Sequence, residues 1–263
     1  MPISEELVVR LSENFLVTEQ QHAPIEPIAS SEAGLTAADA YQVQQAVVSG
    51  LERQGHEIIG KKAGATSPAA QAMLQVDEPL YGRLFDFHQV DYGQAIPTEH
   101  LINPLLECEV AFLMEQPLQG PNITASDVLA ATGAVVAAFE IVDFRTTGWQ
   151  PGRAEAISYN VFAARFVLGQ KPASADRIDL PNLALTLNKN GEQVAVATGA
   201  AVLGNPAQCV AWLANKLAET GLGIQAGDII LSGAIAVAPP PIRAGDRFEA
   251  IFASLETISV QFS

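Results

Sequence analysis

Two acids interrupt an otherwise apolar run in Leu105-Leu106-Glu107-Cys108-Glu109-Val110-Ala111-Phe112. The run predicts a β-strand, and a strand points alternate side chains to opposite faces. Glu107 and Glu109 are therefore expected on one face, with Cys108 on the other. Two carboxylates that close repel each other and lose hydration unless a cation or a shared proton compensates. The acids belong either to the wet face of an amphipathic strand or to a metal site.

A third acid repeats this pattern in a second apolar run, Ala137-Ala138-Phe139-Glu140-Ile141-Val142. Only 16% of the residues are charged, so acids inside two apolar segments require a physical reason. Carboxylate oxygens without nearby histidine or thiolate suit a hard cation such as Mg²⁺ or Mn²⁺ better than zinc. We predict that Glu107, Glu109 and Glu140 hold one such ion, with the solvated strand face as the alternative.

Length and composition bound the class of protein. The 263 residues are 49% hydrophobic and fit one large domain, or a domain with an appended helical segment. A net charge of −15 argues against nucleic acid or an anionic membrane as partner. The two cysteines, Cys108 and Cys209, favour a reducing compartment over a disulfide framework. The acidic N-terminus does not resemble a signal peptide, and no apolar stretch approaches ~18 residues, so a cytoplasmic location is expected.

The spacing of apolar, glycine and proline residues changes after about residue 56. We therefore expect a helical N-terminal segment (1–56) followed by a β-rich catalytic domain (57–263), which is an α+β organisation. Ser4 and a capping box beginning at Thr36 open the first two expected helices. Further segments are expected as helices at 67–74, 127–138 and 206–217, and as strands at 58–66, 101–113, 184–196, 228–233, 248–251 and 258–262. Asn190-Gly191 predicts a hairpin turn within 184–196.

Lys62 is the candidate proton-transfer residue. It lies between Gly60 and Gly64, whose small size permits close backbone approach. A lysine beside a metal ion in an apolar pocket can exchange protons with a substrate. A surface lysine at a strand end is the alternative, and the adjacent Lys61 leaves the choice between the two lysines open.

Together these segments resemble the 2-oxopent-4-enoate hydratase and 4-oxalocrotonate decarboxylase family within the fumarylacetoacetate hydrolase superfamily. The resemblance runs from about Thr36 to the C-terminus, and the order and spacing of its motifs make it specific. Its motifs are Gly60-Lys61-Lys62-Ala63-Gly64-Ala65-Thr66-Ser67, Glu78-Pro79-Leu80-Tyr81-Gly82, the two runs around Glu107 and Glu140, Lys189-Asn190-Gly191, Gly199-Ala200-Ala201-Val202-Leu203-Gly204-Asn205-Pro206, Val210-Ala211-Trp212-Leu213-Ala214-Asn215-Lys216-Leu217, Ala226-Gly227-Asp228-Ile229-Ile230-Leu231-Ser232-Gly233 and Ala244-Gly245-Asp246.

The resemblance implies a β-rich roll with flanking helices, usually assembled as a homo-oligomer. It implies Mg²⁺ or Mn²⁺ bound by Glu107, Glu109 and Glu140, with Lys62 in the pocket transferring a proton or holding the oxyanion. The substrate would be a small 2-oxo acid that chelates the ion and passes through an enolate.

Two departures from the family pattern concern the substrate. Family hydratases commonly read Pro-Asp-Phe-Gly where this chain has Pro79-Leu80-Tyr81-Gly82, and decarboxylases tend to carry an aliphatic residue there, as here. Ser158-Tyr159-Asn160-Val161 replaces the usual Ala-Asp-Asn-Ala, which keeps the asparagine and loses the aspartate. Leu80, Asn160 and Ser232 are the predicted substrate contacts.

The resemblance leads to a metal-dependent lyase acting on short unsaturated 2-oxo acids. The first expectation is hydration of 2-hydroxypenta-2,4-dienoate (2-oxopent-4-enoate) to 4-hydroxy-2-oxopentanoate in aromatic-compound catabolism. Decarboxylation of 4-oxalocrotonate (2-oxohex-3-enedioate) is the alternative. An acylpyruvate-type C–C hydrolase and a non-catalytic partner of an active paralogue are further alternatives. A complex of this chain with a paralogous or pathway enzyme is a further expectation for its partners.

Overall fold

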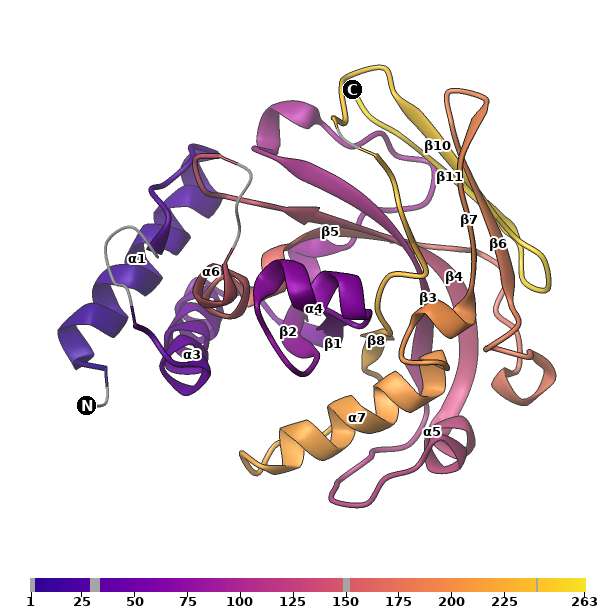
Figure 1. Cartoon of the computed structure of the whole chain (residues 1–263), viewed down its shortest axis with the longest axis horizontal. Helices are drawn as coiled ribbons and strands as arrows, with labels where there is room; N and C mark the ends of the chain where they lie inside the picture. The colour runs from indigo at the N-terminus through magenta and orange to yellow at the C-terminus, as the bar shows by residue number, and fades with distance from the viewer. Residues whose placement is uncertain (1–2, 29–33, 149–151, 240) are drawn as a thin grey trace.

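A curled seven-stranded sheet forms the centre of the molecule in the computed structural model, which describes residues 3–28, 34–148, 152–239 and 241–263 (Figure 1). The hydrogen-bonded order is β2-β1-β8-β3-β4-β5, and β9 pairs with β3. The bounds are β1 (Ile58–Gly64), β2 (Leu80–Phe85), β3 (Pro104–Met114), β4 (Thr132–Asp143), β5 (Ala163–Leu168), β8 (Ile229–Leu231) and β9 (Ala236–Val237).

A second, four-stranded antiparallel sheet has the order β11-β10-β6-β7. Its strands are β6 (Ala184–Lys189), β7 (Glu192–Thr198), β10 (Arg247–Phe252) and β11 (Thr257–Gln261). The expected hairpin joins β6 to β7 through Asn190 and Gly191, at φ of 54° and 86°. Both residues occupy the left-handed region that a tight hairpin turn requires, so this prediction is confirmed.

The described helices lie around the two sheets (Figure 1). They are α1 (Glu5–Gln21), α3 (Ala37–Arg53), α4 (Pro68–Leu74), α5 (Ala125–Ala131), α6 (Arg153–Ser158) and α7 (Pro206–Ala218). Ser4 caps α1, and Thr36 with Asp39 forms the predicted capping box of α3. None of these helices has the length and apolar character needed to cross a bilayer.

The prediction of a helix at 127–138 is wrong beyond residue 131. There α5 ends, and β4 begins at Thr132. Val135, Val136 and Phe139 are buried because β4 lies between β3 and β5 and is covered on both faces. A strand buried on both faces loses the alternating pattern that distinguishes it from a buried helix.

Strand β3 separates the hydrophobic core from the acidic face. Leu106, Cys108 and Val110 point into the main core with side chains of β4, α7 and the second sheet. Glu107 and Glu109 lie on the other face, as the strand period predicted. Hydrophobic side chains of α1, α3 and α6 pack with β2 in a separate cluster at one end of the molecule (Figure 1).

Candidate metal centre

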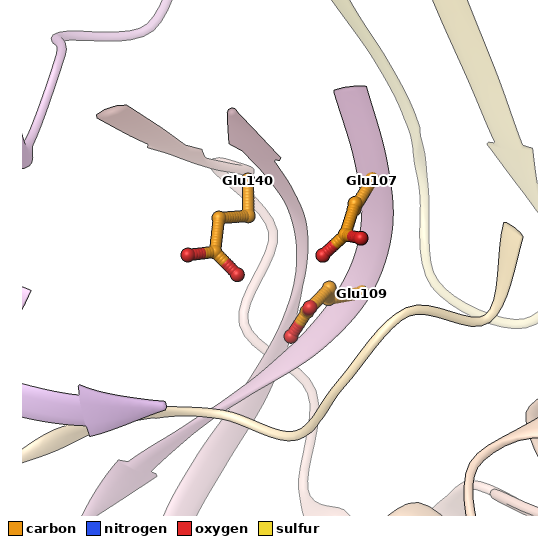
Figure 2. A group of neighbouring side chains, drawn as sticks. All are labelled: Glu107, Glu109 and Glu140. Carbon is orange, nitrogen blue, oxygen red and sulfur yellow. The ribbon is translucent and has the colours of Figure 1, made fainter. Parts of the chain in front are cut away.

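The three acids converge on one point of the central sheet (Figure 2). Strands β3 and β4 are antiparallel and pair Glu107 directly with Glu140, while Glu109 lies two positions along on the same face. Each residue offers a carboxylate oxygen, and these oxygens lie within 4.8 Å of one another. The register of this strand pair therefore brings Glu140 next to two acids that precede it by 31 residues (Glu109) and 33 residues (Glu107) in the sequence.

The carboxylates are poorly satisfied by the protein itself. Glu109 is fully buried, and its Oε2 accepts a hydrogen bond of 2.7 Å from the Gly233 amide. That amide sits at φ +107°, and a Cβ there would meet the Thr66 side chain at 2.5 Å, so glycine is required. Oε1 of Glu109 and Oε2 of Glu140 have no hydrogen-bond donor among the described residues. Buried anionic oxygens without donors fit the binding of a cation.

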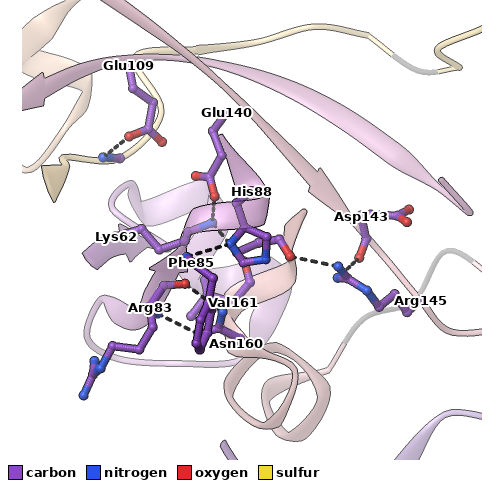
Figure 3. Close-up of polar contacts among 12 residues, drawn as sticks. Lys62, Arg83, Phe85, His88, Glu109, Glu140, Asp143, Arg145, Asn160 and Val161 are labelled. Atoms are coloured by element: carbon purple, nitrogen blue, oxygen red, sulfur yellow. Dashed lines mark hydrogen bonds and ion pairs between the residues drawn. The ribbon is translucent and has the colours of Figure 1, made fainter. Parts of the chain in front are cut away.

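Lys62 is the lysine of this centre (Figure 3). Its ammonium forms an ion pair with Glu140, and Nζ donates a hydrogen bond of 2.9 Å to the Val161 carbonyl. The neighbouring Lys61 points to the other face of β1 and pairs with Asp228. The ambiguity between the two lysines is thus resolved by their position in the fold.

The electrostatics of the centre favour a divalent ion. Three ionised carboxylates (−3) and the Lys62 ammonium (+1) sum to −2, which one divalent cation neutralises. Burial raises the pKa of Glu107 to about 7, opposed by Lys62 and assisted by Glu140. Burial also raises the pKa values of Glu109 and Glu140. Without a cation, the folded protein therefore favours protonated acids at this site.

The turn Asn160–Phe162 aims the Val161 carbonyl at Lys62. Its three residues have φ of 54°, 51° and 58°, a left-handed conformation that is costly for the β-branched Val161. The Asn160 amide group holds the turn, because it accepts from the Arg83 N–H at 2.7 Å and donates to the Arg83 carbonyl at 2.8 Å. A Cβ on Gly82 would meet the Asn160 carbonyl oxygen at 2.7 Å, so the turn also depends on this glycine.

A cavity of about 230 Å³ opens beside the carboxylates. Lys62, Glu107, Thr66 and Ser67 supply its polar groups. The remaining wall is mostly apolar and includes Met73, Leu74, Val142, Phe144, Val161, Phe162, Ile235 and Val237. The sequence alone did not single out the residues of this wall, because they come from distant segments and are individually unremarkable apolar side chains. The arrangement can hold a small ligand that reaches the carboxylates at one end and contacts hydrocarbon at the other.

The three predicted substrate contacts lie near this cavity without lining it. Leu80 is buried in the hydrophobic cluster of α1, α3 and β2. The Asn160 amide is engaged with the Arg83 backbone, which gives it the geometry of a positioning residue. Ser232 is fully buried, one residue before the Gly233 amide that binds Glu109, and its hydroxyl has no partner among the described residues. Their contact with substrate stays a prediction.

The raised carboxyl pKa values predict a stability that depends on pH and on the cation. A carboxyl group with a folded pKa above its unfolded value stabilises the fold below the unfolded pKa. For Glu107 this contribution is lost as the pH rises from about 4.5 through about 7. We expect the melting temperature of chelator-treated protein to fall between about pH 5 and about pH 8, and Mg²⁺ to raise it more at the higher pH. Thermal melts with and without Mg²⁺ measure this gap, and an equal gap at both pH values contradicts the prediction.

Comparisons with known proteins agree with this geometry. Residues 93–262 match the fumarylacetoacetate (FAA) hydrolase C-terminal family. The chain is 38% identical to 2-hydroxyhexa-2,4-dienoate hydratase of Comamonas testosteroni over 239 residues, which cover 90% of each chain. It is 35% identical to 4-oxalocrotonate decarboxylase of Pseudomonas sp. (strain CF600) over 260 residues, which cover 99% of this chain and 98% of the relative.

A solved structure covers nearly the whole fold. The 4-oxalocrotonate decarboxylase from Pseudomonas putida G7, complexed with magnesium and adipate, superposes with a TM-score of 0.95 at 35% identity, covering 99% of each chain. The fold thus matches that of a decarboxylase complexed with magnesium. The chain belongs to the fumarylacetoacetate hydrolase family, and the resemblance inferred from its sequence is confirmed.

Proposed function

We propose that this protein is a divalent-metal-dependent lyase that hydrates 2-hydroxypenta-2,4-dienoate to 4-hydroxy-2-oxopentanoate. The observation that carries the proposal is the convergence of Glu107, Glu109 and Glu140 beside Lys62, with Lys62 and Glu107 lining a small, largely apolar cavity. The similarity to hydratases and to a magnesium-bound decarboxylase supports the same class of reaction. We assign the metal to the three glutamates and proton transfer to Lys62.

The residues of the metal centre have two proposed roles, which are to hold the ion and to transfer a proton. A bound Mg²⁺ or Mn²⁺ would supply the positive charge that stabilises a developing enolate. Glu107, Glu109 and Glu140 would hold that ion, with Glu109 oriented by the Gly233 amide. Lys62, held by Glu140 and the Val161 carbonyl, is placed to exchange a proton at Nζ with a substrate in the cavity. The apolar wall excludes bulk water from the hydrocarbon end of the substrate.

The cavity wall favours hydration of a monoacid over decarboxylation of a diacid. A 2-oxo acid uses one carboxylate at the metal end, and a six-carbon diacid places its second carboxylate against the far wall. Among the described residues that line the cavity, Lys62 is the sole cation. A second carboxylate would therefore lie against apolar side chains without a charged partner, which is costly.

Decarboxylation of 4-oxalocrotonate is the second candidate. Leu80 favours it, because the resemblance associates an aliphatic residue there with decarboxylases and an aspartate with hydratases. The near-complete superposition on a decarboxylase bound to adipate, itself a six-carbon diacid, also supports it.

Two substrates separate these reactions. The protein with Mg²⁺ is incubated with 2-hydroxypenta-2,4-dienoate and, separately, with 2-oxohex-3-enedioate. Loss of the dienol absorbance without CO₂ supports hydration, whereas CO₂ release from the diacid supports decarboxylation. Turnover of an acylpyruvate alone would identify a C–C hydrolase. A protein that binds Mg²⁺ at millimolar concentration yet turns over none of the three overturns the proposed lyase, and one that binds no divalent ion fits the non-catalytic partner.

The wider organisation is proposed on the same grounds. We propose a helical segment at 1–56 ahead of a β-rich roll at 57–263, a cytoplasmic location and a homo-oligomeric state, with no nucleic acid or membrane partner. Of these assignments, the net charge of −15 supports the lack of a nucleic acid or membrane partner. A complex with a paralogous or pathway enzyme is part of the same proposal.

A further inference from the structure

The central sheet carries a second cavity on the face opposite the metal centre. Strand register pairs Lys61 with Arg83 and Lys62 with Gly82. Because side chains alternate, Tyr81 and Arg83 point away from the face that Lys62 occupies. Figure 3 shows the Arg83 guanidinium directed away from Glu140 and Lys62. This second cavity measures about 660 Å³ and lies between α3, β2 and α7.

Arg83 brings an unmatched positive charge to this cavity. Its side chain lines the cavity although the residue is only 6% exposed. Its Nη1 has no hydrogen-bond partner, and the two carboxylates that act on it electrostatically, Asp228 and Glu52, form no direct ion pair with it within the described part of the chain. Burying a guanidinium without an anion costs free energy, because no ion pair offsets its loss of hydration. The arrangement calls for an anionic ligand.

The other charges around the second cavity are already paired. Lys216 contacts Glu78 and Glu219, each at 2.9 Å. Lys61 and Arg83 are paired across β1 and β2 and lie on the same face of the sheet, and Lys61 is paired with Asp228. The four charged side chains of the lining sum to zero, but Glu78 and Glu219 are held at Lys216 with side chains 47% and 63% exposed to water, so the buried Arg83 guanidinium has no contacting carboxylate among the described residues. A ligand carboxylate would supply the contact that Arg83 Nη1 lacks.

The walls beside Arg83 suit a flat hydrocarbon body. Tyr41 and Tyr81 stack with ring centroids 4.5 Å apart and an interplanar angle of 16°. The Arg83 guanidinium lies 5.3 Å from the Tyr81 ring centroid. Leu222, which is 41% exposed, contributes an apolar side chain at the rim. Aromatic faces and a guanidinium together recognise a planar ring or conjugated chain that ends in an acid.

We propose that this second cavity binds a small planar monocarboxylate, with its carboxylate on the Arg83 guanidinium and its flat body against Tyr41 and Tyr81. The site is separate from the metal centre and does not depend on the proposed reaction. Its link to the centre runs through Asn160, which bonds the Arg83 backbone and precedes the carbonyl that accepts from Lys62.

Benzoate is a suitable probe, and neutral benzamide of the same shape is its control. Calorimetric titration of the Mg²⁺-loaded protein is expected to detect benzoate binding and to find benzamide at least about tenfold weaker, since a charge-assisted bidentate contact is lost. Arg83→Gln should weaken benzoate binding about tenfold or more. Glu107→Gln should leave it unchanged, because Glu107 belongs to the metal centre.

A second variant keeps the test valid if Arg83→Gln does not fold. Ala38 lines the second cavity near the start of α3 and is exposed, so Ala38→Trp fills the space without burying a new group in the core. This variant should abolish benzoate binding. Sedimentation of the ligand-free variants reports whether Arg83 instead meets an acid of a second copy of this chain.

Three results overturn the proposal. The first is an absence of benzoate binding to the Mg²⁺-loaded protein. The second is binding that survives Arg83→Gln and Ala38→Trp but is lost in Glu107→Gln, which places the carboxylate at the metal centre. The third is a loss of benzoate binding in Arg83→Gln that goes with a change in its oligomeric state, which makes the second cavity a subunit interface.

Discussion

Replacing Glu109 by glutamine is expected to weaken Mg²⁺ binding by about 100-fold or more and to lower turnover of 2-hydroxypenta-2,4-dienoate by about 1000-fold. Glutamine matches glutamate in shape, and its carbonyl oxygen can still accept from the Gly233 amide. What is lost is one of three negative charges around a shared point. Loss of several kcal/mol of charge stabilisation corresponds to about three orders of magnitude in rate.

Titration calorimetry with Mg²⁺ and the decay of dienol absorbance measure the two effects of Glu109→Gln. Glu115→Gln is the matched control, because Glu115 is exposed just beyond the end of β3 and the substitution makes the same change in charge. The control should bind Mg²⁺ and turn over like the parent. Parent-like Mg²⁺ affinity in Glu109→Gln would falsify the assignment of this carboxylate to the metal.

Replacing Lys62 by methionine is expected to lower turnover by about 100-fold to 10,000-fold, the usual range for loss of a proton-transfer group. Mg²⁺ binding should stay equal or become tighter. The reason is that the Lys62 ammonium now pairs with Glu140, and its removal leaves that carboxylate free for the cation. Loss of turnover without loss of Mg²⁺ binding distinguishes a proton-transfer residue from one that only supports the fold.

Lys61 provides the control for Lys62, because the two adjacent lysines lie on opposite faces of β1. Lys61→Met leaves Asp228 without its partner, so the fold should lose stability by about 3–5 kcal/mol. Turnover per Mg²⁺-binding molecule should remain close to that of the parent. If Lys61→Met loses turnover while Lys62→Met keeps it, the roles of the two lysines are reversed.

Local patterns predicted much of the secondary structure and one face of the metal centre. The capping residues Ser4 and Thr36 and the turn at Asn190-Gly191 act through contacts within a few residues, so they are legible in the sequence. The same locality explains the error at 127–138. Whether an apolar run is a strand or a helix there depends on neighbours β3 and β5, which come from distant parts of the chain.

The sequence by itself determined that Glu107 and Glu109 share a face, because the strand period is a property of consecutive residues. Only the tertiary structure decided that Glu140 lies opposite Glu107, since register between strands depends on packing of the whole sheet. It also decided which lysine meets the acids, and how the left-handed turn at Asn160–Phe162 holds that lysine. The cavity at Arg83 depends on the packing of α3 and α7 over β2, and no local pattern encodes that contact.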